Sequence, residues 1–334
     1  MSEYKPSFSI TNRIILLLAE ISELTGQIKT TAGLDKNPTL RRKNRILTIH
    51  SSLGIEQNTL TLEQVTDVID GKQVLAPPKD IAEVKNAYEI YEHLELLDPY
   101  SIDDLLKAHG VMMRGLVTEC GEFRSRPVGV VDSKTGNVIH LGTLPNYVPE
   151  QTENLLMWAQ SSDVHMLIKS CVFHYEFEVI HPFLDGNGRV GRLWHTLLLS
   201  KWNEFFAWLP VESMIFQRQQ EYYNTINKCN VQCDSTAFIE FMLETIKLTL
   251  EQALTTYSKE QVEEQDTEQV DLTALLDFCK IPRTRTEMQE YCGISGRKRF
   301  TQHILKPLLE ENKLAMTLPD KPNSRNQKYY TVDQ

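Results

Sequence analysis

One short stretch restricts the fold of this chain more than any other, and it reads HPFLDGNGRVGR from His181 to Arg192. Apolar residues at helical intervals precede and follow it, and Pro182 cannot continue the first helix. Glycines on either side of Asn187 permit backbone angles that other residues resist. The stretch therefore predicts a helix, a glycine-rich loop and a second helix.

The start of the second predicted helix suits a phosphate group. A helix N-terminus that follows glycines presents unpaired N–H groups and the positive end of the helix dipole. Arg189 and Arg192 are three residues apart, so both lie on one helix face and can reach the same anion. His181 can accept a proton from an attacking hydroxyl, and Asp185 offers a hard oxygen ligand for Mg²⁺. Together these residues indicate a site for a magnesium-bound nucleoside triphosphate beside a proton acceptor.

The stretch matches the Fic family motif HPFx(D/E)GNGRxxR at every defined position, and the chain therefore resembles Fic proteins. Most characterised Fic proteins transfer AMP from ATP to a hydroxyl side chain of a target protein. The resemblance implies that His181 is the general base and that Asp185 binds Mg²⁺. It also implies that the loop and the helix start bind the nucleotide, through Gly186, Asn187, Gly188, Arg189, Val190, Gly191 and Arg192.

A second motif lies at the end of a helix that the sequence predicts from Thr39 to about Glu56. Ser52 and Glu56 occupy the defined places of the Fic inhibitory motif, (S/T)xxxE(G/N). The resemblance implies that Glu56 pairs with Arg192 and blocks the γ-phosphate, since an arginine held by a carboxylate is not available for phosphate. Gln57 departs from the Gly or Asn of the motif and does not favour a left-handed helix cap, a role that falls to Asn58 instead. The alternative is an ordinary exposed glutamate.

Two further features are assigned by the same resemblance. Residues 128–131 and 138–141 read as a hairpin around a turn at 134–137, and Fic proteins carry such a flap to bind the backbone of the target. The flap residues are then Val128, Gly129, Val130 and Val131. Tyr222 and Tyr223 are assigned to the adenine pocket, although paired tyrosines on a helix are more often core residues.

Composition restricts the broad class of protein. The chain has 334 residues, 41% hydrophobic and 24% charged, as in a globular protein with more than one domain. No apolar run is long enough for a membrane span, and the N-terminus lacks a signal-peptide pattern. Six cysteines form no CxxC pair, which favours reduced thiols and a cytoplasmic protein. The net charge of −10 argues against wholesale nucleic-acid binding.

The sequence predicts a mainly α fold: a Fic-type helical bundle with a β-hairpin flap and a small C-terminal winged helix-turn-helix. The expected parts are an N-terminal helical region with the inhibitory helix (1–75), a Fic catalytic core (76–257), a linker (258–269) and a winged-helix-like domain (270–334). The last part has a small excess of Lys and Arg. Arg297, Lys298 and Arg299 begin its third helix and suit DNA, although such modules often bind protein instead.

These features predict a protein adenylyltransferase that uses ATP and Mg²⁺, modifies a Ser, Thr or Tyr hydroxyl of a target protein, and is restrained by Glu56. Self-modification and a homodimer are compatible with the sequence. One alternative is a Fic enzyme with altered chemistry, such as removal of AMP or transfer of another phosphate-containing group. The other is a nucleotide-sensing regulator that binds DNA through residues 270–334.

Overall fold

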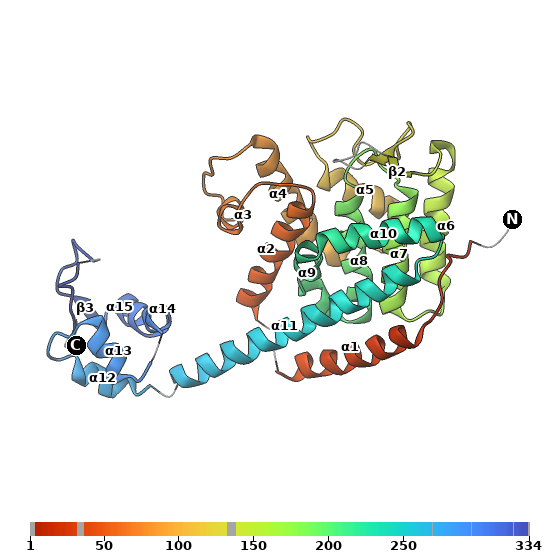
Figure 1. Ribbon diagram of the computed structural model, residues 1–334. Helices are drawn as coiled ribbons and strands as arrows, with labels where there is room; N and C mark the ends of the chain where they lie inside the picture. Colours follow the sequence, from red (N-terminus) through yellow and green to blue (C-terminus); the bar gives the residue numbers. More distant parts are fainter. Residues whose placement is uncertain are drawn as a thin grey trace. The chain divides into compact units, whose positions relative to one another are not determined.

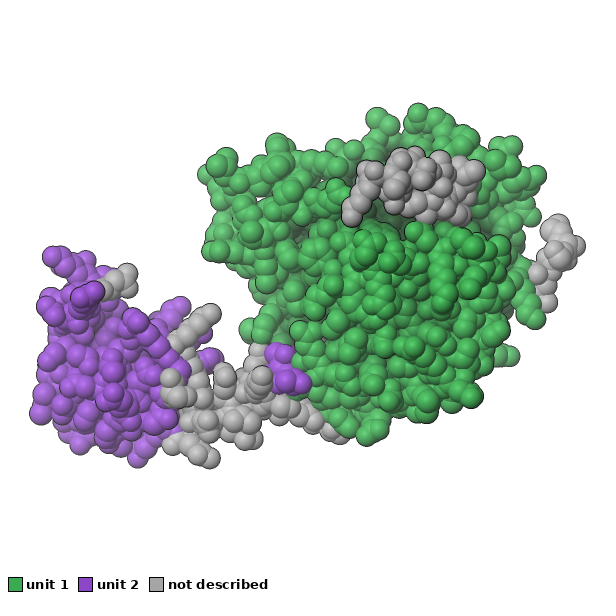
Figure 2. Space-filling model, viewed as in Figure 1, with its two compact units in different colours: residues 1–254 green, residues 255–334 purple. Residues whose placement is uncertain are grey.

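The computed structural model of the protein describes residues 4–31, 37–131, 138–268, 270–294, 296–322 and 324–332. The chain divides into two compact units, Met1–Leu254 and Thr255–Gln334, which Figure 2 shows in different colours. The described residues are mainly helical, which confirms the predicted fold class.

The first unit contains ten helices that lie wholly within its described residues and the beginning of an eleventh. They are α1 (Asn12–Thr31), α2 (Pro38–Ile55), α3 (Leu62–Ile69), α4 (Pro78–Glu92), α5 (Ile102–Met112), α6 (Val148–Ser161), α7 (Met166–Ile180), α8 (Asn187–Trp202), α9 (Val211–Gln217), α10 (Gln219–Gln232) and α11 (Thr236–Glu268). Short 3₁₀ helices are η1 (Leu94–Leu96), η2 (Pro145–Tyr147) and η3 (Glu204–Trp208).

Helices α7 and α8 form the centre of this unit (Figure 1). Both are buried along nearly their whole length, as expected of helices at the centre of a bundle. Trp194 on α8 is fully buried and donates from Nε1 to the carbonyl oxygen of Pro99 at 2.9 Å. Two helices fixed in this way hold the loop between them, residues 181–186, in one position.

The inhibitory-motif helix α2 packs on this centre. Asn37 caps its start by accepting a hydrogen bond from the Leu40 amide at 3.0 Å, and Pro38 occupies the first turn. Ile49 and Leu53 on α2 belong to the same hydrophobic core as α8. The position of α2 against the motif is therefore set by core packing as well as by polar contacts.

The predicted hairpin is present in the first unit. Strand β1 (Gly129–Val131) pairs antiparallel with β2 (Val138–Leu141), with Gly129 opposite Leu141. The Gly142 amide extends the pairing by donating to the Val128 carbonyl at 3.1 Å. The predicted turn at 134–137 falls outside the described residues, as do the side chains of Val130 and Val131.

The C-terminal unit has the predicted order of elements. Its helices are α12 (Leu272–Phe278), α13 (Arg285–Tyr291), α14 (Arg297–Phe300), the π-helical turn η4 (Thr301–Leu305) and α15 (Lys306–Glu310). Strand β3 (Leu314–Met316) pairs antiparallel with β4 (Tyr329–Thr331), and Arg283 bridges to Tyr329. The side chains of Lys298 and Arg299 are outside the described residues, so contact with DNA stays a prediction.

Two helical assignments differ from the sequence-based ones. The sequence assigned 258–269 to a linker that follows the core, whereas α11 continues to Glu268. Glu, Gln and Lys in this polar segment are good helix formers, so polarity alone does not end the helix. Helix α9 was not predicted. No helix within the described residues is long and apolar enough to cross a bilayer.

Candidate active site

The motif loop runs from the end of α7 to the start of α8, and two residues in left-handed conformation shape it. His181 has φ 53° and closes α7, with its amide donating to the Phe177 carbonyl at 2.9 Å. Gly186 has φ 86° and precedes the first residue of α8. A Cβ atom at Gly186 would lie 2.6 Å from the sulfur of Met113, so both the backbone angle and the packing require glycine there.

The side chain of Asn187 holds the loop together. Its Oδ1 accepts from the Phe183 amide at 2.9 Å, and its Nδ2 donates to the Phe183 carbonyl at 2.8 Å. Asn187 is buried, and the two bonds satisfy backbone groups that water does not reach. The side chain of Asn187 therefore shapes the loop, while the amides at the start of α8 are left to bind an anion.

The His181 ring lies beside Glu178, one helical turn earlier. Its Nδ1 is 3.3 Å from the Glu178 carbonyl oxygen and 3.9 Å from the carboxylate oxygen Oε2. Burial raises the pKa of Glu178 to about 7, against a lowering effect of Arg192 and a raising effect of Glu56. Since Nδ1 faces Glu178, the ring nitrogen that would accept a proton from a substrate hydroxyl is Nε2.

Arg124 supports the backbone of His181 from the side of the hairpin. Its guanidinium donates to the His181 carbonyl at 2.7 Å, to the Arg126 carbonyl at 2.9 Å and to the Thr143 carbonyl. Burial lowers the pKa of Arg124. A Cβ atom at Gly142 would lie 2.9 Å from this guanidinium and 3.3 Å from Cβ of His181. The base of the hairpin is thus fixed directly against the motif histidine.

Asp185 is the exposed carboxylate of the loop. Its side chain is 53% exposed, and Oδ1 accepts from Arg189 at 3.0 Å and from the Gly186 amide at 2.6 Å. No group of three or more His, Cys, Asp or Glu side chains among the described residues could hold a metal ion. Mg²⁺ is commonly bound by one or two carboxylates with substrate phosphates and water, and a single exposed Asp185 fits that mode.

His109 on α5 fixes the backbone next to Asp185. The Gly121 amide donates to its Nδ1 at 2.9 Å, so the proton is on Nε2, which donates to the Asp185 carbonyl at 3.0 Å. The ring stacks on Phe183 with centroids 3.7 Å apart. Burial lowers the pKa of His109 to about 4, and the ring is therefore neutral near pH 7.

The inhibitory motif and the second motif arginine meet in the structure. Arg192 is 1% exposed; it donates to Glu56 Oε1 at 2.7 Å, to Ser52 Oγ at 3.1 Å and to the Ser52 carbonyl at 3.0 Å. Burial lowers the pKa of Arg192, but the charge and the hydrogen bond of Glu56, together with the nearby Tyr222 and Tyr223, outweigh burial and raise the pKa overall. A Cβ atom at Gly188 would lie 2.5 Å from Glu56 Oε1. The Glu56 carboxylate therefore lies against the N-terminus of α8, where an anion would bind.

The residues after Glu56 differ from the prediction. Gln57, not Asn58, has the left-handed conformation, with φ 66°. The Gln57 amide donates to the Gly54 carbonyl at 3.0 Å and the Asn58 amide to the Leu53 carbonyl at 3.1 Å, which closes the helix end. Asn58 instead uses its side chain to bond with α4. Gln57 thus carries backbone strain that a glycine would not.

Not all of the predicted nucleotide-binding side chains face the loop. Val190 is fully buried, and a Cβ atom at Gly191 would meet Glu178 at 2.9 Å and Phe177 at 3.2 Å, so this glycine allows α7 and α8 to approach closely. Tyr222 is buried and its hydroxyl is 3.0 Å from Nε2 of the buried His174.

Tyr223 packs edge-on against Tyr222 and is 40% exposed. Of the two tyrosines, only Tyr223 has an exposed ring surface that an adenine base could contact. The adenine pocket stays a prediction.

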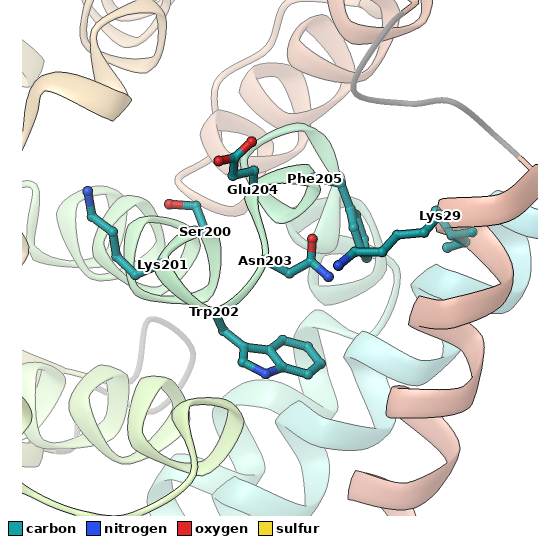
Figure 3. A pocket seen from close by; sticks show the side chains of 8 residues that line it. Lys29, Ser200, Lys201, Trp202, Asn203, Glu204 and Phe205 are labelled. Carbon is teal, nitrogen blue, oxygen red and sulfur yellow. The ribbon is translucent and has the colours of Figure 1, made fainter.

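A cavity of about 500 Å³ lies elsewhere in the first unit. It is lined by Ile28 and Lys29 of α1 and by residues 200–205 at the far end of α8 (Figure 3). Helical rise places Ser200 roughly 18 Å from Gly188 along α8. The cavity is therefore separate from the motif loop.

Sequence reasoning missed the residues that hold the loop from other elements: Glu83 on α4, His109 on α5, Arg124 before the hairpin, and Glu178 on α7. Glu178 precedes His181 by one helical turn, so its spacing offered a signal. The other three residues are distant from the loop in the sequence, and only the folded structure brings them into contact with it or with the start of α8.

Comparisons with known proteins identify the family of the chain. Residues 99–199 match the Fic/DOC family, and residues 268–331 match the C-terminal domain of filamentation induced by cAMP protein Fic-like. A crystal structure of a Fic family protein from Desulfovibrio desulfuricans G20 is 42% identical, covers 99% of both chains and superposes with a TM-score of 0.76. The chain belongs to the Fic family.

More distant relatives carry the name of an activity. The chain is 28% identical over 215 residues to "Protein adenylyltransferase Fic" from Nematostella vectensis, covering 61% of this chain and 47% of the relative. It is 28% identical over 205 residues to "Protein adenylyltransferase fic-1" from Caenorhabditis elegans, covering 58% and 38%. The matched part is thus less than half of each of these relatives. The solved structure of C. elegans Fic-1 shares the fold, with 20% identity and a TM-score of 0.58 over 74% of this chain and 72% of that one.

Proposed function

We propose that this protein is an adenylyltransferase that transfers AMP from ATP to a Ser, Thr or Tyr hydroxyl of a target protein, and that Glu56 restrains it. The main support is the position of the Glu56 carboxylate, which pairs with Arg192 at 2.7 Å and lies against Gly188. A carboxylate oxygen at a helix N-terminus takes the place of a phosphate oxygen. Glu56 and the γ-phosphate therefore compete for Arg192, and ATP that binds while Glu56 stays on Arg192 is not seated for transfer.

In the proposed reaction, the hydroxyl oxygen of the target bonds to the α-phosphorus of ATP. The bond from that phosphorus to the oxygen bridging to the β-phosphate breaks, and pyrophosphate leaves. His181 takes the hydroxyl proton on Nε2, since Nδ1 faces Glu178. The amides at the start of α8 and Arg189 stabilise the charge on the phosphate oxygens. Asp185 would hold Mg²⁺, which neutralises charge on the phosphates when bound.

The hairpin would present the target. Its edge can pair with an extended backbone segment and hold the acceptor hydroxyl near His181. The support for this role is the contact of Gly142 and Arg124 with His181 at the base of the hairpin. A target held there would approach the histidine directly.

Labelling with ATP tests the proposal. Glu56→Gly should incorporate α-³²P from ATP into lysate proteins at least tenfold faster than the native chain, because Arg192 is released. His181→Ala in the Glu56→Gly background should abolish labelling. His93→Ala, at an exposed histidine that ends α4, should leave it unchanged. Incorporation of γ-³²P instead of α-³²P, or ATP binding by Glu56→Gly in calorimetry without any labelling, would refute AMP transfer.

A further inference from the structure

A buried carboxylate connects the inhibitory helix with the first motif arginine. Glu83 on α4 is 4% exposed, and its two oxygens have different partners. Oε1 accepts from Arg189 at 2.9 Å, and Oε2 accepts from Nδ2 of Asn58 at 2.8 Å. The ammonium of Lys79, one turn earlier on α4, is 3.9 Å from Oε1. Glu83 thus bonds both with Asn58, just after the end of α2, and with Arg189, at the start of α8.

Each partner of Glu83 is held by few other groups. Arg189 is 4% exposed, and its guanidinium also donates to Asp185 at 3.0 Å. Asn58 also donates to the Asp80 carbonyl at 3.2 Å and accepts from the Leu60 amide at 3.1 Å. A long arginine side chain that would otherwise sample many rotamers is therefore fixed mainly by two carboxylates, of which Glu83 is the buried one.

We propose that Glu83 is a positioning residue: one oxygen holds Arg189 in the orientation that receives the triphosphate, and the other anchors Asn58 so that Glu56 stays on Arg192. This inference rests on the proposed function, whose regulation it extends. Release of Glu56 then requires the end of α2 to leave Glu83 as well. The bond to Asn58 is a hydrogen bond to a charged group in a buried setting, which is the strong kind.

An exchange of partners tests the Asn58 anchor. Asn58→Asp keeps the shape and the acceptor for the Leu60 amide but turns a carboxylate toward Glu83. At saturating ATP it should raise AMP transfer of the chain with native Glu56 about tenfold, as expected for the loss of one hydrogen bond to a charged group. Gln57→Glu adds the same charge at an exposed neighbouring position and should change transfer less than twofold.

The double variant Asn58→Asp, Glu83→Gln provides the rescue. The amide introduced at position 83 can donate to the carboxylate introduced at position 58 while its oxygen still accepts from Arg189, so transfer should return to within twofold of the native rate. A protein that is merely destabilised by either change would not be restored by combining them.

The Arg189 half of the inference is tested where Glu56 no longer acts. In the Glu56→Gly background, Glu83→Gln should raise the KM for ATP about tenfold and change kcat less than threefold, because a phosphate contact present throughout the reaction is weakened. Asn58→Asp in that background should change neither constant. A rise of KM for Asn58→Asp as large as that for Glu83→Gln would overturn the division of roles.

Hydrogen exchange separates failure of this inference from failure of the proposed function. Amides of residues 53–58 should exchange at least tenfold faster in Asn58→Asp than in the native chain, and near the native rate in the double variant. This result does not depend on AMP transfer. If Glu56→Gly transfers no AMP, the proposed function is wrong while the exchange data still test the anchor. Unchanged exchange and unchanged transfer in Asn58→Asp would refute the anchor.

Discussion

Gln57 offers a direct way to change the strength of the inhibitory contact without touching the contact itself. It has φ 66°, its side chain is exposed, and it follows Glu56 at the end of α2. The left-handed conformation costs a residue with a Cβ atom roughly 1–2 kcal/mol relative to glycine. The greater freedom of glycine in the unfolded chain offsets roughly 0.4–1 kcal/mol of this. Gln57→Gly should therefore stabilise the folded first unit by about 1 kcal/mol.

In the proposed regulation, the same strain enters the equilibrium between the inhibited and released states. Glu56 reaches Arg192 only while the end of α2 keeps the closed form seen here. If release relaxes the Gln57 backbone, glycine stabilises the inhibited form by about 1 kcal/mol, which corresponds to about fivefold in the equilibrium. Gln57→Gly should thus lower AMP transfer about fivefold in the chain with native Glu56. It should have no effect in the Glu56→Gly background.

Thermal unfolding and labelling with α-³²P ATP measure the two effects on the same samples. For a unit of this size, 1 kcal/mol corresponds to a rise in Tm of about 2–4 °C. Cys233→Gly is the matched control, because Cys233 ends α10 with φ 51° and is exposed. It should raise Tm similarly and leave transfer unchanged. An unchanged or lower Tm for Gln57→Gly would refute the strain argument. A higher Tm with unchanged transfer would show that release leaves this backbone in place.

Three further changes test the loop and its supports. Gly186→Ala places a Cβ atom 2.6 Å from the Met113 sulfur, at a residue with φ 86°. Urea unfolding should therefore give a free energy of unfolding about 2 kcal/mol lower than that of the native chain. A variant as stable as the native chain would contradict the packing argument. The buried His109 has its pKa lowered to about 4, and the unfolded chain therefore binds the extra proton below pH 6.5. The free energy of unfolding therefore decreases as the pH is lowered through this window. Between pH 7 and pH 5, in magnesium-free buffer, the free energy of unfolding of His109→Gln should decrease by about 2 kcal/mol less than that of the native chain. An equal decrease in both proteins would show that the His109 ring is not buried in its neutral form. Ser52→Ala in the Glu56→Gly background should raise the KM for ATP severalfold, because Arg192 loses its hydroxyl partner. An ATP affinity equal to that of Glu56→Gly in calorimetry would exclude this role for Ser52.

Local patterns predicted the parts of this protein that depend on local chemistry. Pro182 and the glycines correctly marked the loop, and the apolar spacing marked the two buried helices around it. Ser52 and Glu56, one helical turn apart on α2, both contact Arg192, as their spacing on one helix face required. Each of these outcomes follows from geometry within a few residues.

Contacts between distant elements lay outside such patterns. Nothing near Glu83 in the sequence indicates Arg189, because α4 and α8 meet only through core packing. The reading of Asn58 as the left-handed cap was wrong for a related reason. The helix end places Gln57 at that position, and the side chain of Asn58 is held by α4, which a propensity argument does not include.

In the proposed regulation, α2 restrains Arg192 and positions it at the same time. Glu56 takes one contact of the guanidinium, while the hydroxyl and the carbonyl of Ser52 take two others. When the Glu56 carboxylate leaves, the Ser52 contacts can remain, so the arginine keeps its direction and gains an unpaired donor for phosphate. Removing all of α2 would instead take away every one of these acceptors, and the guanidinium would lose the contacts that set its direction. The proposed inhibition therefore depends on one movable carboxylate, carried by a helix whose Ser52 the proposed active site also needs.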